Sequence, residues 1–240
     1  MERPAEATER LSNSQTFKEE HTSRNDVPQK VEPFVTITRQ AGAGGSIIGE
    51  KLAKYLREFD LEAKCSWTVF DKAMVDMVLE EHSLPERFAE LMGEKQTSII
   101  EDILDEIDSV HPTQANLVGK TSETILHLAR NGNVVLVGRG ASVVTRHLPS
   151  GIHVRLVASL ENRIWHVRET YHVGRIEAAR LIQKKDQGKR EYLRKYFGWD
   201  IDDPQLYDLM INTDRFTFDD AVEIIAGEVL RDRKRSSNAT

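Results

Sequence analysis

Residues 34–46 read FVTITRQAGAGGS, and the fold of the chain can be argued outward from them. The run Phe34–Thr38 is β-rich and follows Pro33, a glycine-rich turn comes next, and apolar residues then recur at helical spacing from Ile47 to Leu56. Glycines let the backbone N–H groups of such a turn point inward, and the N-terminus of the following helix adds partial positive charge. The stretch therefore predicts a strand, an anion-binding turn and a helix, with a plain tight turn as the alternative.

The turn departs from the common phosphate-binding pattern G-x-x-x-x-G-K-S/T. Gly44 matches the second glycine and Ser46 the hydroxyl, but Gly45 replaces the lysine and Arg39 stands where the first glycine would be. Because Arg39 follows the strand immediately, its guanidinium could fold over the turn and supply the charge that Gly45 lacks. The alternative is that Arg39 bridges the strand end to an acidic neighbour.

Four more short apolar runs predict strands. They are Trp67–Phe70, Val134–Val137, His153–Val157 and Leu209–Ile211. Helical patterns lie between and after them, the last opening at Thr217. This alternation predicts an α/β fold in which helices flank a parallel sheet and the crossovers are right-handed. Residues 72–130 carry two or three helical patterns and no convincing strand, so we expect a helical insertion there.

The two ends of the chain differ from this core in composition. Residues 1–30 have few large apolar residues and no sustained periodicity, which predicts a flexible extension. Residues 231–240, RDRKRSSNAT, are interpreted as a short C-terminal tail. We therefore expect one domain over residues 31–230.

Composition excludes several classes of protein. The formal net charge of −6 argues against a dedicated nucleic-acid-binding protein, which usually has a basic domain. No apolar run approaches the roughly 20 residues that a membrane helix needs, and the N-terminus lacks the apolar region of a signal peptide. The single cysteine, Cys65, cannot form an intrachain disulfide, which fits a reducing compartment. We expect a cytoplasmic protein that binds neither nucleic acid nor membrane.

Charge is unevenly distributed along the chain. Residues 80–108 hold ten acidic and two basic residues, whereas residues 163–195 hold ten basic and four acidic ones. Charge runs usually form solvated helix faces. The basic run would gain a use if an anionic substrate lay beside it, and the acidic segment or the charged tails could contact a protein partner.

Two residues at strand ends are candidates for a ligand site. Arg139 lies between Gly138 and Gly140 directly after a buried strand, and ligands of open α/β sheets bind beyond such strand ends. A glycine-flanked arginine there suits a monophosphate. Asp71 ends the strand that begins at Trp67, and its alternative role is to cap the helix that follows.

The run ITRQAGAGGSIIGEKLAKYL, residues 37–56, resembles the opening of the cytidylate-kinase-like family, whose members typically read I-S/T-R-x-x-G-S/A-G-G there, also without the lysine. The resemblance spans about residues 33–230. Its other segments, in order, are Val69–Lys72, Val137–Gly140, Val154–Arg163, Asp186–Gly198 and Tyr207–Thr213. The family implies a nucleoside-monophosphate-kinase version of the P-loop fold, with residues 72–130 as a monophosphate-binding insertion and residues 163–198 as a basic lid.

The resemblance also implies a reaction, in which the γ-phosphoryl group of Mg²⁺-bound ATP moves to a nucleoside monophosphate, CMP or dCMP. Gly42, Ala43, Gly44, Gly45 and Ser46 would hold the donor phosphates, with the Ser46 hydroxyl reaching the Mg²⁺. Arg39, Arg139, Arg163, Arg190 and Arg194 would stabilise the transferring group. Asp71, Arg139, Asp186 and Lys189 would bind the acceptor, since Asp186–Arg190 resembles the family's D-x-x-R with Lys189 in the arginine's place.

The departures from the family pattern leave alternatives open. Gly45 replaces the lysine of other phosphate loops, and Val137 and Gly140 stand where true cytidylate kinases have the two carboxylates of D-G-R-D. One alternative is a catalytically impaired, nucleotide-binding regulatory protein of the same fold. Another is a kinase for a different acceptor. The lid arginines could likewise form surface salt bridges.

Overall fold

A computed structural model of the chain describes residues 32–71 and 114–238. The expected N-terminal extension, most of the expected insertion and the acidic segment 80–108 lie outside these residues.

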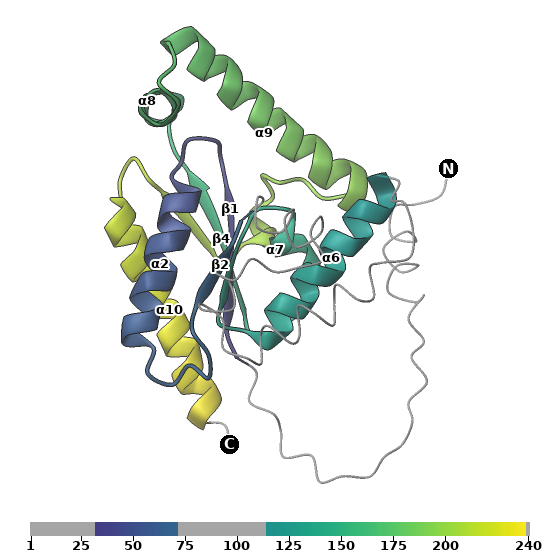
Figure 1. The fold of residues 1–240 in the computed structure, drawn as a ribbon, viewed down its shortest axis with the longest axis vertical. Helices are drawn as coiled ribbons and strands as arrows, with labels where there is room; N and C mark the ends of the chain where they lie inside the picture. Colours follow the sequence, from purple (N-terminus) through teal and green to yellow (C-terminus); the bar gives the residue numbers. More distant parts are fainter. Residues whose placement is uncertain (1–31, 72–113, 239–240) are drawn as a thin grey trace, which may run out of the picture.

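The described residues form a five-stranded sheet whose order is β2-β3-β1-β4-β5 (Figure 1). All four pairings between neighbouring strands are parallel. The strands are β1 (Phe34–Arg39), β2 (Thr68–Phe70), β3 (Val134–Val137), β4 (Gly151–Val157) and β5 (Leu209–Asn212). The predicted α/β fold is therefore confirmed, and each strand expected from the sequence is present with small shifts at its ends.

Helices cover both faces of this sheet (Figure 1). They are α2 (Gly45–Phe59) and α10 (Phe218–Asn238) on one face, and α6 (Gln114–Asn131) and α7 (Ala141–Val144) on the other. Successive strand residues alternate between the two cores, as the period of a strand requires: Val35 and Ile37 pack with α2 and α10, whereas Phe34 packs with α6. The fully apolar strand Val134–Val137 is buried on both sides for this reason.

The second half of the chain adds a pair of helices at the carboxyl edge of the sheet. They are α8 (Leu160–Tyr171) and α9 (Arg175–Phe197), and α9 is followed by the 3₁₀ turn η1 (Pro204–Leu206). Ile164, Ala178 and Ile182 join α8 to α9 and bury Ala41 of the glycine-rich turn beneath them. The segment expected as a lid thus packs on the turn, and its closing motion stays a prediction.

Two segments named from the sequence are partly described. Residues 114–130 of the expected helical insertion lie in α6, whose Ile125 and Leu128 pack against β3, and the monophosphate-binding role of the insertion stays a prediction. Residues 231–238 of the expected C-terminal tail continue α10, which ends at Asn238 and buries Arg233.

Candidate functional site

The glycine-rich turn connects β1 to α2 with two residues in the left-handed region. Gly42 has φ 85° and Gly44 has φ 82°, conformations that glycine adopts without strain. A Cβ atom on Gly42 would lie 2.7 Å from the carbonyl oxygen of Arg163, so the turn packs directly on α8. The first N–H groups of α2 have no acceptor within the helix, and the exposed Ser46 lies among them. This geometry suits an anion.

Arg39 lies across the turn, where the sequence suggested that it could. A Cβ atom on Gly45 would lie 2.7 Å from Cγ of Arg39, and one on Gly138 would lie 2.2 Å from its Nη1. The two glycines therefore make the room that the arginine occupies. Burial lowers the pKa of Arg39, and the charges of Asp71 and Asp186 oppose that shift. Since a guanidinium stays protonated at physiological pH, Arg39 brings a positive charge beside the turn.

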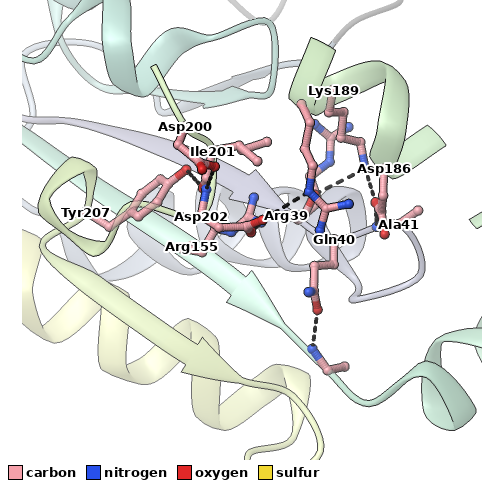
Figure 2. A network of polar contacts seen from close by, with 12 residues as sticks. Arg39, Gln40, Ala41, Arg155, Asp186, Lys189, Asp200, Ile201, Asp202 and Tyr207 are labelled. Atoms are coloured by element: carbon pink, nitrogen blue, oxygen red, sulfur yellow. Dashed lines mark hydrogen bonds and ion pairs between the residues drawn. The ribbon is translucent and has the colours of Figure 1, made fainter. Parts of the chain in front are cut away.

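Asp186 of α9 clamps the turn from the other side (Figure 2). Its Oδ1 accepts the Ala41 N–H at 2.7 Å, and its Oδ2 accepts from Nη1 of Arg163 at 2.6 Å. Burial acts to raise the pKa of Asp186, but the Ala41 N–H, Lys189 and Arg163 outweigh it, so the pKa is lowered. Arg163 also donates to the Ala41 carbonyl at 3.4 Å and is only 11% exposed. The geometry gives Arg163 and Asp186 a positioning role at the turn.

Lys189 joins Arg39 to this clamp. Its Nζ donates to the Arg39 carbonyl at 3.1 Å and to Oδ1 of Asp186 at 3.2 Å. Burial lowers the pKa of Lys189 to about 8, with Arg39 and Arg155 adding to the effect and Asp186 opposing it. The lowered pKa of Lys189 is therefore chiefly an effect of burial, which Asp186 offsets only in part.

The lowered pKa of Lys189 predicts how anion binding depends on pH. Sulfate stays a dianion near neutral and alkaline pH, and it favours the protonated lysine. Above about pH 8, the sulfate-bound protein must therefore hold more protons than the free protein. The affinity for sulfate should be constant below that pH and fall as the pH rises through it. Calorimetric titrations with sulfate across this range check the expectation. Lys189→Arg should remove the fall, because its charge persists; an equal fall in that variant would contradict the assignment.

A cavity of about 190 Å³ opens beside Arg39 at the carboxyl edge of the sheet. It is lined by Thr38, Arg39, Gly138, Arg139, Gly140, Lys189, Tyr192, Leu193 and Ile201. Arg139 has φ 53° between two glycines that also have positive φ, so the chain turns sharply here. Three cations from β1, the turn after β3 and α9 thus meet at one cavity, whose aromatic wall is Tyr192. Such a site can hold a phosphate attached to an organic group.

The other candidate residues lie around this cavity rather than in its lining. Asp71 directly follows β2 and acts on Arg39 through its charge. On α9, Nε of the half-exposed Arg190 donates to Oδ2 of Asp202 at 3.0 Å, and Arg194 is exposed near the end of the helix. The structure thus brings Arg39, Arg139 and Lys189 to one cavity, whose lining includes neither Arg190 nor Arg194.

Sequence reasoning missed Arg155 of β4. This arginine is 2% exposed, and its Nη2 donates to Oδ1 of Asp202 at 2.6 Å. The sequence does carry a signal for Arg155, because it is a charged residue inside the mostly apolar run His153–Val157. Arginine is rarely fully buried without a partner, so its position in such a strand indicates a buried ion pair.

Within residues 32–71 and 114–238, no cluster of three or more His, Cys, Asp or Glu side chains could hold a metal ion. No helix in those ranges is both long and apolar enough to cross a membrane.

Comparison with known proteins gives the following matches. A family model described as the cytidylate kinase-like family matches residues 34–215. A cytidylate kinase from Sulfolobus acidocaldarius is 32% identical over 91 residues, which make up 38% of this chain and 50% of that protein. A uronate isomerase from Corynebacterium glutamicum is 23% identical over 111 residues, 46% of this chain and 21% of that protein. The chain thus spans half or less of these curated relatives. A solved structure of an uncharacterized protein from Eubacterium ventriosum superposes with a TM-score of 0.62 at 19% identity, over 82% of this chain and 98% of that one, which shows the fold alone.

Proposed function

The chain belongs to the cytidylate kinase-like family, and from that premise we propose that it transfers the γ-phosphoryl group of Mg²⁺-bound ATP to a nucleoside monophosphate, CMP or dCMP. The observation that carries the proposal is the position of Arg39. This side chain lies against the anion-binding turn through Gly45 and also lines the cavity that holds Arg139 and Lys189. One charge therefore adjoins both places where a phosphate would bind.

The donor phosphates would lie on the turn and the first N–H groups of α2. The first N–H groups of α2 have no acceptor within the helix, and the helix N-terminus favours negative charge. Mg²⁺, when bound with the nucleotide near the Ser46 hydroxyl, would neutralise charge on the donor phosphates. Arg39 takes the place of the lysine that other phosphate loops carry.

The acceptor would occupy the cavity, with its phosphate toward Arg139 and Lys189 and its base toward Tyr192. An oxygen of that phosphate attacks the γ-phosphorus, the bond to the ADP oxygen breaks, and ADP leaves. Little covalent chemistry falls to the protein, so catalysis consists of holding two anions in line and stabilising the charge that moves between them. Arg39 lies where it can do both.

Calorimetry with CMP and with Mg²⁺–ATP, together with a coupled assay of ADP release over a panel of nucleoside monophosphates, tests the proposal. We expect CMP to bind, cytidine to bind far more weakly, and ADP release to depend on a monophosphate. Binding of CMP without turnover would replace the proposal by the regulatory alternative. ADP release that depends only on a phosphate-free acceptor would replace it by the kinase for another substrate.

A further inference from the structure

The guanidinium of Arg155 has buried donors that no described residue accepts. Nη2 is paired with Asp202, but Nε and Nη1 are buried and have no hydrogen-bond partner among residues 32–71 and 114–238. Tyr207 approaches the same group, with its ring centre 5.7 Å from Cζ; burial raises the pKa of Tyr207, and its hydrogen bond with Arg155 acts to lower it. Buried N–H donors normally have a hydrogen-bond acceptor. The two unpaired nitrogens of Arg155 therefore indicate an acceptor supplied by a bound ligand.

Arg155 lines a small space beside the candidate active site. This space of about 10 Å³, enough for about one water molecule, is also lined by Arg39, Lys189 and Arg190. Arg39, Lys189 and Ile201 line the larger cavity as well, so the two spaces adjoin. Figure 2 shows the pair of Arg155 and Asp202 on one side of Arg39, with Lys189 and Asp186 on the other.

The single carboxylate of Asp202 pairs with two arginines beside this space. Its Oδ1 accepts from Arg155 and its Oδ2 from Arg190 of α9. The residue lies on the loop between α9 and β5 and is 46% exposed, so this carboxylate can leave Arg155 without unpacking a core. Among the described residues, Asp186 and Asp202 hydrogen-bond to members of the cation group Arg39, Arg155, Lys189 and Arg190, and Asp71 acts on Arg39 through its charge. The excess positive charge favours a further anion here.

We propose that Arg155 is a phosphate-binding residue of the acceptor site, and that Asp202 is an internal substitute for the acceptor's phosphate, which displaces it. A phosphate dianion offers more acceptor oxygens and more charge than one carboxylate, so it can engage the remaining donors of Arg155 as well as Lys189. Its arrival also releases Arg190 from Asp202, on the face of α9 beside the cavity. The site would thereby select acceptors that carry a phosphomonoester over neutral hydroxyl compounds. The inference rests on the proposed function only in taking this anion to be the acceptor's phosphate.

Inorganic phosphate is the probe that tests the exchange, because it requires neither a nucleotide nor turnover. Affinity is read from the dependence of Tm on phosphate concentration, with chloride added to hold ionic strength constant. Asp202→Asn removes the competing charge, so it should lower Tm without phosphate and bind phosphate about tenfold more tightly than the unaltered chain. Glu58→Gln on α2 is the matched control, since it removes one exposed carboxylate far from the site and should change neither value.

Arg155→Met provides the second measurement and leaves Asp202 paired with Arg190. It should bind phosphate about tenfold more weakly than the unaltered chain, and adding Asp202→Asn should not restore the affinity. If Asp202→Asn gains no more than Glu58→Gln, or if Arg155→Met binds phosphate normally, the proposal is overturned. Should Asp202→Asn not fold, Arg155→Met alone decides. If the phosphate affinities follow the predicted pattern but no phosphoryl transfer occurs, the proposed function is rejected and the phosphate site is kept. If transfer to CMP occurs but the affinities do not follow the pattern, the phosphate site is rejected and the proposed function is kept.

Discussion

Arg233→Met is expected to lower the free energy of unfolding by about 3–5 kcal/mol. Arg233 is 2% exposed near the end of α10. Its Nη1 donates to Oε2 of Glu32 at 2.5 Å, and its Nη2 is paired with Oδ2 of Asp60 at 2.7 Å and with Oδ1 of Asn133 at 2.7 Å. Methionine would remove the cation that two buried carboxylates share, taking away the ion-pair partner of Asp60 and leaving Glu32 the more exposed Lys64. An uncompensated buried charge is among the most destabilising changes that one substitution makes.

Arg231→Met is the matched control for this variant. Arg231 lies on the same helix and pairs with Glu228, but it is 61% exposed, and surface pairs contribute at most about 1 kcal/mol. Urea unfolding at neutral pH measures both variants. A loss in Arg233→Met no larger than that in Arg231→Met would contradict the assignment of Arg233 as a buried tie between α10, β1 and the end of α2.

Arg39→Met is expected to lower kcat/KM for phosphoryl transfer by about 10²–10³-fold, with little effect on folding. The side chain lies beside the glycine-rich turn and lines the acceptor cavity, so its charge would act on the group in transit. Arg39→Lys should recover part of the loss, because it keeps the charge and loses the planar fork of donors. Lys54→Met, on the exposed face of α2, removes one positive charge elsewhere and should retain full activity. Activity of Arg39→Met within a few-fold of the unaltered chain would mean that another cation replaces the lysine of the phosphate loop.

The sheet could be predicted from the sequence because its signals are local. Each strand is a short apolar run, and the turn after β1 carries glycines where left-handed conformations occur, at Gly42 and Gly44. The proposal that Arg39 folds over the turn also rested on neighbours in sequence, since it lies six residues from Gly45. These features depend on residues within one βα unit.

The features that were missed depend on partners far away in the chain. RDRKRSSNAT has the composition of a solvated tail, and only the fold brings its Arg233 to Glu32 and Asp60. Arg155 was taken as one residue of a strand because Asp202, its counter-ion, lies beyond the whole of α9. The phosphate contact expected of Arg163 stays a prediction, and the sequence alone does not indicate its ion pair with Asp186 of the next helix. Sequence patterns identify charged residues, whereas the pairing of charges is set by tertiary structure.

Transfer of the γ-phosphoryl group from ATP to a nucleoside monophosphate is tested by following that group itself. The full chain is incubated with Mg²⁺, CMP and ATP radiolabelled at the γ-phosphate, and the products are separated. The account predicts that label appears in CDP in step with ADP formation, and that Arg39→Met slows its appearance while Lys54→Met does not. Label that appears in no nucleoside diphosphate with any monophosphate tested, or only in inorganic phosphate, would contradict it.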